Sequence, residues 1–407
     1  MSNPAEPARA STLSPGVRRA IWGLGVTQII GWGTTYYLLS LMGGQIARDL
    51  DLPKGVMLFG VSMTLVGAAL FGPWIGRWQD RRGAREVMTI GSLLVASGLF
   101  AISRSTDATL YFLGWSLISL ATPMALYSAA FTGLTQLAGS QARRAIIFLT
   151  FLGGLASSIA WPTTAWMLTF LDWRGVIAVF ALINLVICVP IHLLVLGGRP
   201  RDHDGKAANV VPPGLPAEAT MRAFLLIAAV LATNAVIFNA WSLLVFPILE
   251  GVGFATSAAV FVASFVGVCQ VFGRMGEMAT GDRFTAFQSA TFAIVLLPLS
   301  FLVLIFAGGN LIVGCLFALL YGVSNGLMTI ARGTLTLVIF GSLGYGERLG
   351  KVMFASGLMG AAAPVAGGFV LETAGTGPLI YSLLALTFVS CALMLVLAAH
   401  CRRHGLK

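Results

Sequence analysis

Long apolar runs, separated by short polar or glycine- and proline-rich breaks, fill most of this chain. A helix of about 20 apolar residues crosses the roughly 30 Å hydrocarbon core of a bilayer, whereas a strand of a membrane barrel needs only about ten. The lengths of the runs therefore predict helices and an all-α membrane protein. The twelve spans that we expect lie at residues 20–42, 56–75, 87–103, 109–137, 145–170, 176–196, 223–246, 258–276, 286–306, 311–340, 352–371 and 378–399.

Composition supports this assignment to the membrane. Hydrophobic residues make up 57% of the chain and charged residues 10%, whereas about a quarter of a typical soluble domain is charged. Twelve spans leave only short connections between them. We therefore expect no separate soluble domain and no catalytic domain on a tether.

The basic residues are divided unequally between the two sets of connections. The chain has 25 Lys and Arg against 15 Asp and Glu, and nineteen of the 25 fall on one side of the predicted spans against four on the other. Because short cytoplasmic loops hold the positive excess, both termini and the longest connection are predicted to be cytoplasmic. The net charge of +10 is then a topology signal, and no nucleic-acid partner is expected. The remaining two basic residues, Arg274 and Arg332, fall within predicted spans and are assigned to neither side.

The longest connection divides the chain into two sets of six spans. It contains Gly197-Gly198 and Pro212-Pro213, a composition typical of linkers. Such a bisection is typical of transporters built from repeats, whose substrate site lies near the midplane between the halves. The predicted parts are an N-terminal tail (1–19), a six-helix bundle (20–196), a linker (197–222), a second six-helix bundle (223–399) and a C-terminal tail (400–407).

A charged, glycine-containing motif follows the second run. It reads Gly72-Pro-Trp-Ile-Gly76-Arg77-Trp-Gln-Asp80-Arg81-Arg82-Gly83-Ala-Arg85. At this position it resembles the loop 2–3 signature of the major facilitator superfamily. A weaker copy, from Gly273 to Asp282-Arg283, follows the eighth run, and Asp172-Trp173-Arg174 resembles a tryptophan–arginine pair of the same superfamily.

The resemblance implies a fold of two six-helix bundles and a cytoplasmic gate in the loops. By this resemblance, Asp80 and the arginines form ion pairs that lock one conformation and break in the other. The residues assigned to the gate are Gly72, Gly76, Arg77, Asp80, Arg81, Gly83, Arg85, Asp282 and Arg283.

Two arginines are predicted to lie inside the bilayer. Arg274 precedes Asp282 by eight residues, which on a helix places it about 12 Å inward from the loop. Arg332 precedes Phe340 by eight residues and reaches a similar depth if its helix is continuous. An arginine in hydrocarbon costs a few kcal/mol, so such a residue is expected to face a cavity. The alternatives are an ion pair between Arg274 and Glu277 and a snorkelling, interfacial Arg332.

The position of Arg274 also resembles that of the substrate-binding arginine in monocarboxylate transporters and bacterial oxalate/formate exchangers. A guanidinium group binds a carboxylate through two parallel hydrogen bonds. The exchangers' second cation is a lysine in the eleventh span, which has no charge here. Arg332 could replace that lysine and favour a dianion, whereas a single arginine in the cavity favours a monoanion.

Polar and aromatic residues of the expected cavity-lining spans complete the predicted substrate site. For the aromatic residues, helix packing or an interfacial belt is the alternative. The additional candidates are Gln28, Trp32 and Tyr36 in the first span, Tyr127 in the fourth, Asn234 in the seventh, Gln270 in the eighth, and Tyr321 and Asn325 in the tenth.

Absent motifs narrow the function further. No Walker or HExxH sequence occurs, so we expect neither a cofactor nor a metal, and no enzyme activity. The first and fourth spans contain no acidic residue, which disfavours exporters of cationic drugs. We expect a monomeric secondary transporter of the bacterial inner membrane that moves a small organic anion, a mono- or dicarboxylate, by alternating access. Protons are a candidate coupling ion, and efflux of a neutral or amphiphilic compound is the alternative function.

Overall fold

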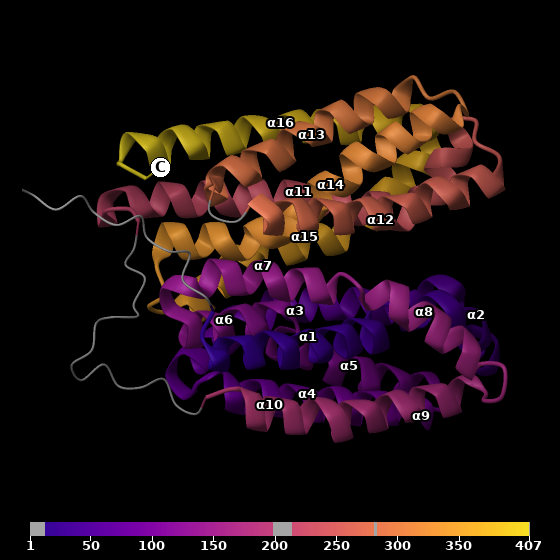
Figure 1. The fold of residues 1–407 in the computed structure, drawn as a ribbon. Coiled ribbons are helices and arrows are strands. Elements are labelled where there is room, and N and C mark those ends of the chain that lie inside the picture. The colour runs from indigo at the N-terminus through magenta and orange to yellow at the C-terminus, as the bar shows by residue number, and fades with distance from the viewer. Residues whose placement is uncertain (1–12, 198–213, 281–282, 407) are drawn as a thin grey trace, which may run out of the picture.

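The computed structural model describes residues 13–197, 214–280 and 283–406, and every regular element in these ranges is a helix. Figure 1 shows two layers of helices, one formed by residues 13–197 and the other by residues 214–406. We call them the N-terminal and C-terminal halves. We call the end of the molecule that holds Val195, Ala217 and the C-terminus the linker end, and the other end the distal end.

The N-terminal half consists of short and long helices that pack around α1 and α4. Its elements are α1 (Pro15–Thr35), α2 (Leu38–Asp49), α3 (Lys54–Arg82), α4 (Ala84–Ser103), α5 (Ala108–Ala125), α6 (Tyr127–Ala138), the 3-10 turn η1 (Gly139–Gln141), α7 (Ala142–Gly153), α8 (Ala156–Met167), α9 (Trp173–Ile183), the π-helical turn η2 (Asn184–Cys188) and α10 (Val189–Val195).

The C-terminal half consists of six long helices. They are α11 (Ala217–Gly251), α12 (Thr256–Thr280), α13 (Ala286–Ile305), α14 (Leu311–Phe340), α15 (Tyr345–Ala374) and α16 (Thr376–Arg403). Helices α11 and α13 continue through Pro247 and Pro298, so proline alone does not break them.

Three of the predicted spans in the N-terminal half are interrupted helices. Between α1 and α2, the Trp32 carbonyl accepts hydrogen bonds from the backbone N–H groups of both Tyr36 and Tyr37. Between α5 and α6, Leu126 is extended (φ −92°, ψ −162°). The third break, between α7 and α8, falls at Gly154 and Leu155.

The structure describes ten stretches of helix long and apolar enough to cross a membrane, not the twelve predicted. The predicted spans 20–42 and 145–170 are not among them as separate spans. Residues 108–153 form one such stretch of 46 residues, which joins the predicted fourth span to α7 through η1. Because these stretches make up most of the described residues, the chain is an integral membrane protein.

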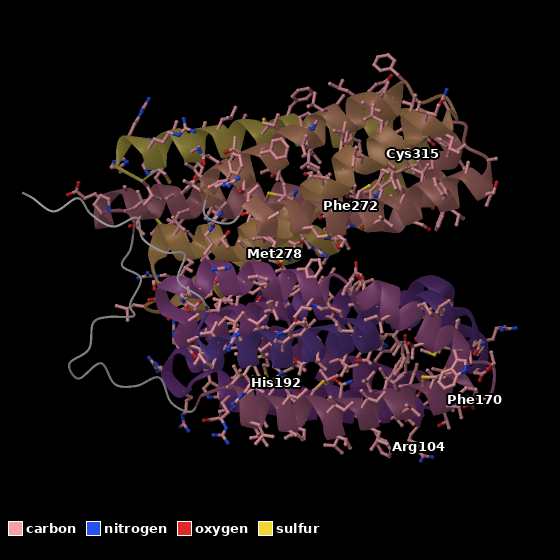
Figure 2. All side chains as sticks on the ribbon, viewed as in Figure 1. Arg104, Phe170, His192, Phe272, Met278 and Cys315 are labelled. Atoms are coloured by element: carbon pink, nitrogen blue, oxygen red, sulfur yellow. The ribbon has the colours of Figure 1, made fainter. Side chains whose placement is uncertain are left out.

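Large apolar side chains remain on the outside of the bundle. Phe272 is 57% exposed and Phe292 is also 57% exposed, as expected of surfaces that contact hydrocarbon. Arg104 and Phe170 mark the distal end of the N-terminal half, opposite the linker end (Figure 2).

Candidate functional site

Arg274 is buried at the boundary between the halves. It is 6% exposed, and its Nη2 donates one long hydrogen bond (3.4 Å) to the Thr329 hydroxyl on α14. Its guanidinium lies against Gly154 of the N-terminal half, where a β-carbon would overlap Nη1. Its Nε has no hydrogen-bond partner, and no carboxylate among the described residues lies within ion-pair distance of it.

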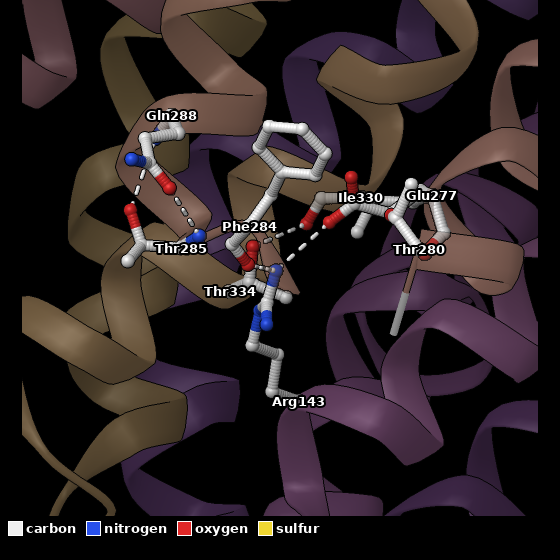
Figure 3. A network of polar contacts seen from close by, with 8 residues as sticks. All are labelled: Arg143, Glu277, Thr280, Phe284, Thr285, Gln288, Ile330 and Thr334. Carbon is white, nitrogen blue, oxygen red and sulfur yellow. Dashed lines mark hydrogen bonds and ion pairs between the residues drawn. The ribbon is translucent and has the colours of Figure 1, made fainter. Parts of the chain in front are cut away.

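Glu277 forms an ion pair with Arg143 and not with Arg274. Its carboxylate accepts a 3.0 Å hydrogen bond from Arg143 on α7, and Arg143 also donates to the Phe284 carbonyl at 2.7 Å (Figure 3). The suggested ion pair between Arg274 and Glu277 is therefore wrong, because Glu277 points across the boundary. Sequence analysis counted Arg143 only as a topology signal, and nothing local indicates a partner 134 positions away.

Arg332 on α14 lies in the same region as Arg274. Its side chain is half-buried and within electrostatic range of both Arg274 and the Tyr127 hydroxyl. No hydrogen bond or ion pair of its guanidinium occurs within the described ranges. Two guanidinium groups thus share one region without a carboxylate to neutralise either of them.

Tyr127 joins these cations to a row of aromatic rings. It is the first residue of α6, and its hydroxyl lies against Gly153. The next residue, Gly154, is the one that the Arg274 guanidinium contacts. Its ring centre is 5.4 Å from that of Trp32, which is 5.7 Å from that of Tyr36. The Nε1 of Trp32 has no hydrogen-bond partner in the described structure.

The predicted residues of the C-terminal half differ in their surroundings. Tyr321 is 1% exposed, packs against Trp241 at 5.4 Å, and has an unpaired hydroxyl within electrostatic range of Tyr36. Asn325 is 7% exposed and its carbonyl accepts from Thr329. Asn234 and Gln270 are half-buried.

Gln28 makes a structural contact through its amide nitrogen, whereas its Oε1 has no hydrogen-bond partner in the described structure. It is fully buried, and its Nε2 donates to the Ala125 carbonyl at 2.9 Å. That carbonyl is freed by the break between α5 and α6, so Gln28 stabilises the interrupted helix.

Asp80 does not form the ion pairs that the resemblance implies for the gate, because it caps the N-terminus of a helix. Its carboxylate accepts the backbone N–H groups of Gly346 (2.9 Å) and Glu347 (2.8 Å) at the start of α15. A helix N-terminus offers free N–H groups and a favourable dipole to a carboxylate. The expectation that Asp80 pairs with arginines is therefore wrong.

Glu347, which sequence analysis did not single out, forms the ion pair instead. Arg77 binds it through two hydrogen bonds of 3.0 and 2.8 Å, and Lys351 approaches it at 2.7 Å. This pair joins α3 to α15, and the pair of Glu277 with Arg143 joins α12 to α7. Both pairs lie at the linker end and hold the halves together there.

The glycines of the motif allow α3 and α15 to touch through their backbones. A β-carbon on Gly76 would overlap the Gly346 carbonyl, and Gly72 faces Gly350. Gly83 ends α3 with φ +91°, a conformation that favours glycine. The remaining gate candidates make no contact across the halves that the structure describes: Arg81, Arg85 and Arg283 are exposed, and Asp282 lies outside the described residues.

At the distal end, Trp173 and Arg174 both bind Asp49. The Trp173 indole donates at 2.8 Å and Arg174 at 2.9 Å. The hydrogen bond from Trp173, together with that from Arg174, lowers the pKa of the Asp49 carboxyl group. The contact joins α2 to α9 within the N-terminal half, so it acts inside one half and not between the two.

Two solved structures of transporters have a similar arrangement of helices. The human organic anion transporter MFSD10 (TETRAN) superposes with a TM-score of 0.74 at 14% identity, covering 94% of this chain and 100% of that one. The proton:xylose symporter XylE superposes with a TM-score of 0.68 at 13% identity, covering 93% of this chain and 95% of that one. At these identities the likeness concerns the fold. No curated protein sequence matches the chain.

The sequence itself matches a family model over most of its length. The model of the major facilitator superfamily aligns with residues 22–341, a range that includes the motif at Gly72–Arg85 as well as Arg274 and Arg332. The chain belongs to the major facilitator superfamily of transporters.

Proposed function

We propose that this transporter moves a small organic anion of the carboxylate class by secondary active transport. The observation that carries the proposal is the pair of guanidinium groups, Arg274 and Arg332, without a carboxylate partner in the described structure. A buried charge left unpaired costs several kcal/mol, and an anionic ligand would remove that cost. Two cations accommodate a monocarboxylate or a dicarboxylate.

The surroundings of Arg274 support a carboxylate as the ligand. Its single hydrogen bond within the protein is long, and its Nε is unpaired, so most of its donors are available. A guanidinium is planar and binds a carboxylate through two hydrogen bonds. The position of Arg274 on the second helix of its half also resembles that of the carboxylate-binding arginine in monocarboxylate and oxalate/formate transporters.

The gate supports alternating access. In this structure the linker end is held closed by the contacts of Asp80 and Arg77 with α15 and of Arg143 with α12. Substrate release at the linker end requires these contacts to break. We propose that α1–α2 and α7–α8 each cross the bilayer, which gives twelve spans with both termini in the cytoplasm of a bacterial cell. The linker end is then cytoplasmic and the transporter acts as a monomer.

We propose protons as the coupling ion, with Glu277 as the candidate acid. Glu277 is 6% exposed, and its ionised form holds Arg143. Protonation would remove one of the contacts that close the linker end.

The ion pair between Glu277 and Arg143 argues against the alternative function, transport of a neutral or amphiphilic compound. That function required Arg274 to be neutralised by Glu277, and Glu277 is occupied by Arg143. The structural neighbours include an organic anion transporter and a sugar symporter, and they share only the fold with this chain.

Ligand-induced stabilisation of the purified protein tests the proposal. We expect lactate, oxalate or succinate to raise the unfolding temperature, because a ligand present at 100 times its Kd stabilises the folded state by about 2.7 kcal/mol. Arg274→Gln should abolish this effect, whereas Arg283→Gln, which changes an exposed arginine beyond α12, should not. Equal stabilisation of the wild type and Arg274→Gln would disprove the anion assignment.

A further inference from the structure

A continuous row of aromatic rings leads from the boundary of α1 and α2 to the N-terminus of α6. The ring centres of Tyr36 and Trp32 are 5.7 Å apart with an interplanar angle of 71°, and those of Trp32 and Tyr127 are 5.4 Å apart at 45°. Phe131 stacks on Tyr127 at 5.3 Å. The row therefore forms one apolar wall made by two helices of the N-terminal half.

The wall ends at the cationic group of the proposed anion site. The Tyr127 hydroxyl lies against Gly153 and the Arg274 guanidinium lies against Gly154. Because neither glycine has a β-carbon, both polar groups reach the same stretch of backbone. An anion held by Arg274 therefore has the aromatic wall beside it.

The two ends of the wall differ in burial. Phe131 is fully buried and Tyr127 is 8% exposed, whereas Trp32 and Tyr36 are only half-buried. The rings of the C-terminal half provide a comparison, because Trp241, Phe301, Phe317 and Tyr321 pack together with no more than 3% of any ring exposed. That cluster is core, whereas Trp32 and Tyr36 each keep part of their surface accessible.

Three buried hydrogen-bond donors on or near the wall have no partner among the described residues. They are the Trp32 Nε1, the Tyr321 hydroxyl and the Arg274 Nε, each buried and without a partner in the described structure. Tyr321 lies within electrostatic range of Tyr36, so donors from both halves meet here. Buried donors are normally satisfied, and a ligand with acceptors at two positions would satisfy these.

We propose that the transported anion is an aromatic carboxylate, and this inference rests on the proposed anion function. Its carboxylate binds Arg274, and its ring packs against Trp32 and Tyr36. A second acceptor on the ring, such as a hydroxyl group, faces the Trp32 Nε1 and the Tyr321 hydroxyl. Aromatic rings favour offset or edge-to-face packing with centroids about 4.5–7 Å apart, a preference that a saturated ring of the same size does not share.

Calorimetric binding to the purified full-length protein tests the preference for a ring. The probes are benzoate, cyclohexanecarboxylate, which has the same number of ring carbons without a flat π-system, 4-hydroxybenzoate, and the uncharged benzamide. We expect benzoate to bind about two- to tenfold more tightly than cyclohexanecarboxylate. 4-Hydroxybenzoate should bind more tightly than benzoate, and benzamide should bind at least tenfold more weakly.

Variants of Trp32 separate the aromatic wall from the cation. Trp32→Leu should remove the preference for benzoate over cyclohexanecarboxylate while both acids still bind, and Trp32→Phe should keep that preference but lose the gain from the 4-hydroxyl group. Trp22→Leu, on the same helix but 66% exposed, is the control and should change neither. Thermal unfolding without ligand checks that each variant is folded.

Each other result contradicts a different part of the proposal. Equal affinities for benzoate and cyclohexanecarboxylate would overturn the aromatic inference and leave the anion function standing. Benzamide binding as tightly as benzoate would overturn the anion function, and with it the carboxylate part of this inference. Binding of none of the three acids would overturn the aromatic inference, and stabilisation by lactate, oxalate or succinate would then decide the anion function separately.

Discussion

At the residue scale, the absence of one side chain determines where the charge of Arg274 lies. Gly154 has an ordinary helical conformation (φ −65°, ψ −20°), so its backbone does not require glycine. A β-carbon there would occupy the position of the Arg274 Nη1. The small residue therefore provides space for the guanidinium and is not needed for a turn.

Replacing this glycine should weaken anion binding without unfolding the protein. In Gly154→Ala, we expect the flexible end of Arg274 to be displaced, with a loss of anion affinity of about 10- to 100-fold, since a charged hydrogen bond contributes about 1.5–3 kcal/mol. Calorimetry with a carboxylate gives the affinity, and thermal unfolding without ligand should be unchanged. Gly276→Ala, which adds a methyl group in open space on α12, is the control. Unchanged affinity in Gly154→Ala would show that the observed position of the guanidinium is unimportant for binding.

Sequence reasoning identified single residues better than their partners. Helix arithmetic from the following loop places Arg274 inside the bundle, and the structure buries it. The partners of Glu277 and Arg77 could not be predicted, since they are 134 and 270 positions away. The hydrogen bond from Gln28 to the Ala125 carbonyl could not be predicted either, because that carbonyl is left without a helical partner only where α5 ends.

At the scale of elements, α3 and α15 approach each other through glycine. The contacts of Gly76 with Gly346 and of Gly72 with Gly350 bring two backbones together, so little side-chain adjustment is available at this interface. In the proposed alternating-access cycle, opening of the linker end would separate these two backbones.

A methyl group at this interface should therefore shift the conformational equilibrium. In Gly76→Ala, overpacking of about 1–3 kcal/mol should favour the conformation open at the linker end by about 5- to 150-fold and slow transport. Reactivity of cysteines introduced at the linker end would report the opening. Gly368→Ala, in open space on α15, should behave as the wild type, and a closed linker end in Gly76→Ala would disprove the argument.

The helix breaks show why the predicted spans were only partly right. Apolar runs identify stretches that can cross the membrane, but hydropathy does not indicate where a helix stops within a run. Leu126 breaks one run although it is apolar, whereas Pro298 leaves α13 continuous. The breaks depend on tertiary contacts, such as the hydrogen bond from Gln28 to Ala125.

At the scale of the whole molecule, the described residues form two ion pairs between the halves at the linker end, and these pairs differ in burial. The side chains of Arg77 and Glu347 are 45% and 25% exposed, whereas those of Arg143 and Glu277 are 18% and 6% exposed. An exposed pair contributes about 0.2–1 kcal/mol, whereas removal of one partner of a buried pair costs about 3–5 kcal/mol. The buried pair should therefore dominate the equilibrium.

Two matched substitutions compare the pairs. Arg77→Gln should change the ratio of closed to open linker ends by no more than about fivefold, and Arg143→Gln by more than tenfold. Distances between spin labels at Arg85 and Arg402, in a background without the five native cysteines, would give the populations. Arg104→Gln at the distal end should have no effect. A larger shift in Arg77→Gln than in Arg143→Gln would contradict the ranking by burial.

The signs of the charges in these two pairs follow the halves of the chain. Both arginines, Arg77 and Arg143, belong to the N-terminal half, and both glutamates, Glu347 and Glu277, belong to the C-terminal half. Two copies of the same half would present like charges to each other at these positions, whereas unlike halves attract. As the chain inserts into a crowded membrane, each half is thus matched to its own complement and repelled by the corresponding half of a neighbouring copy.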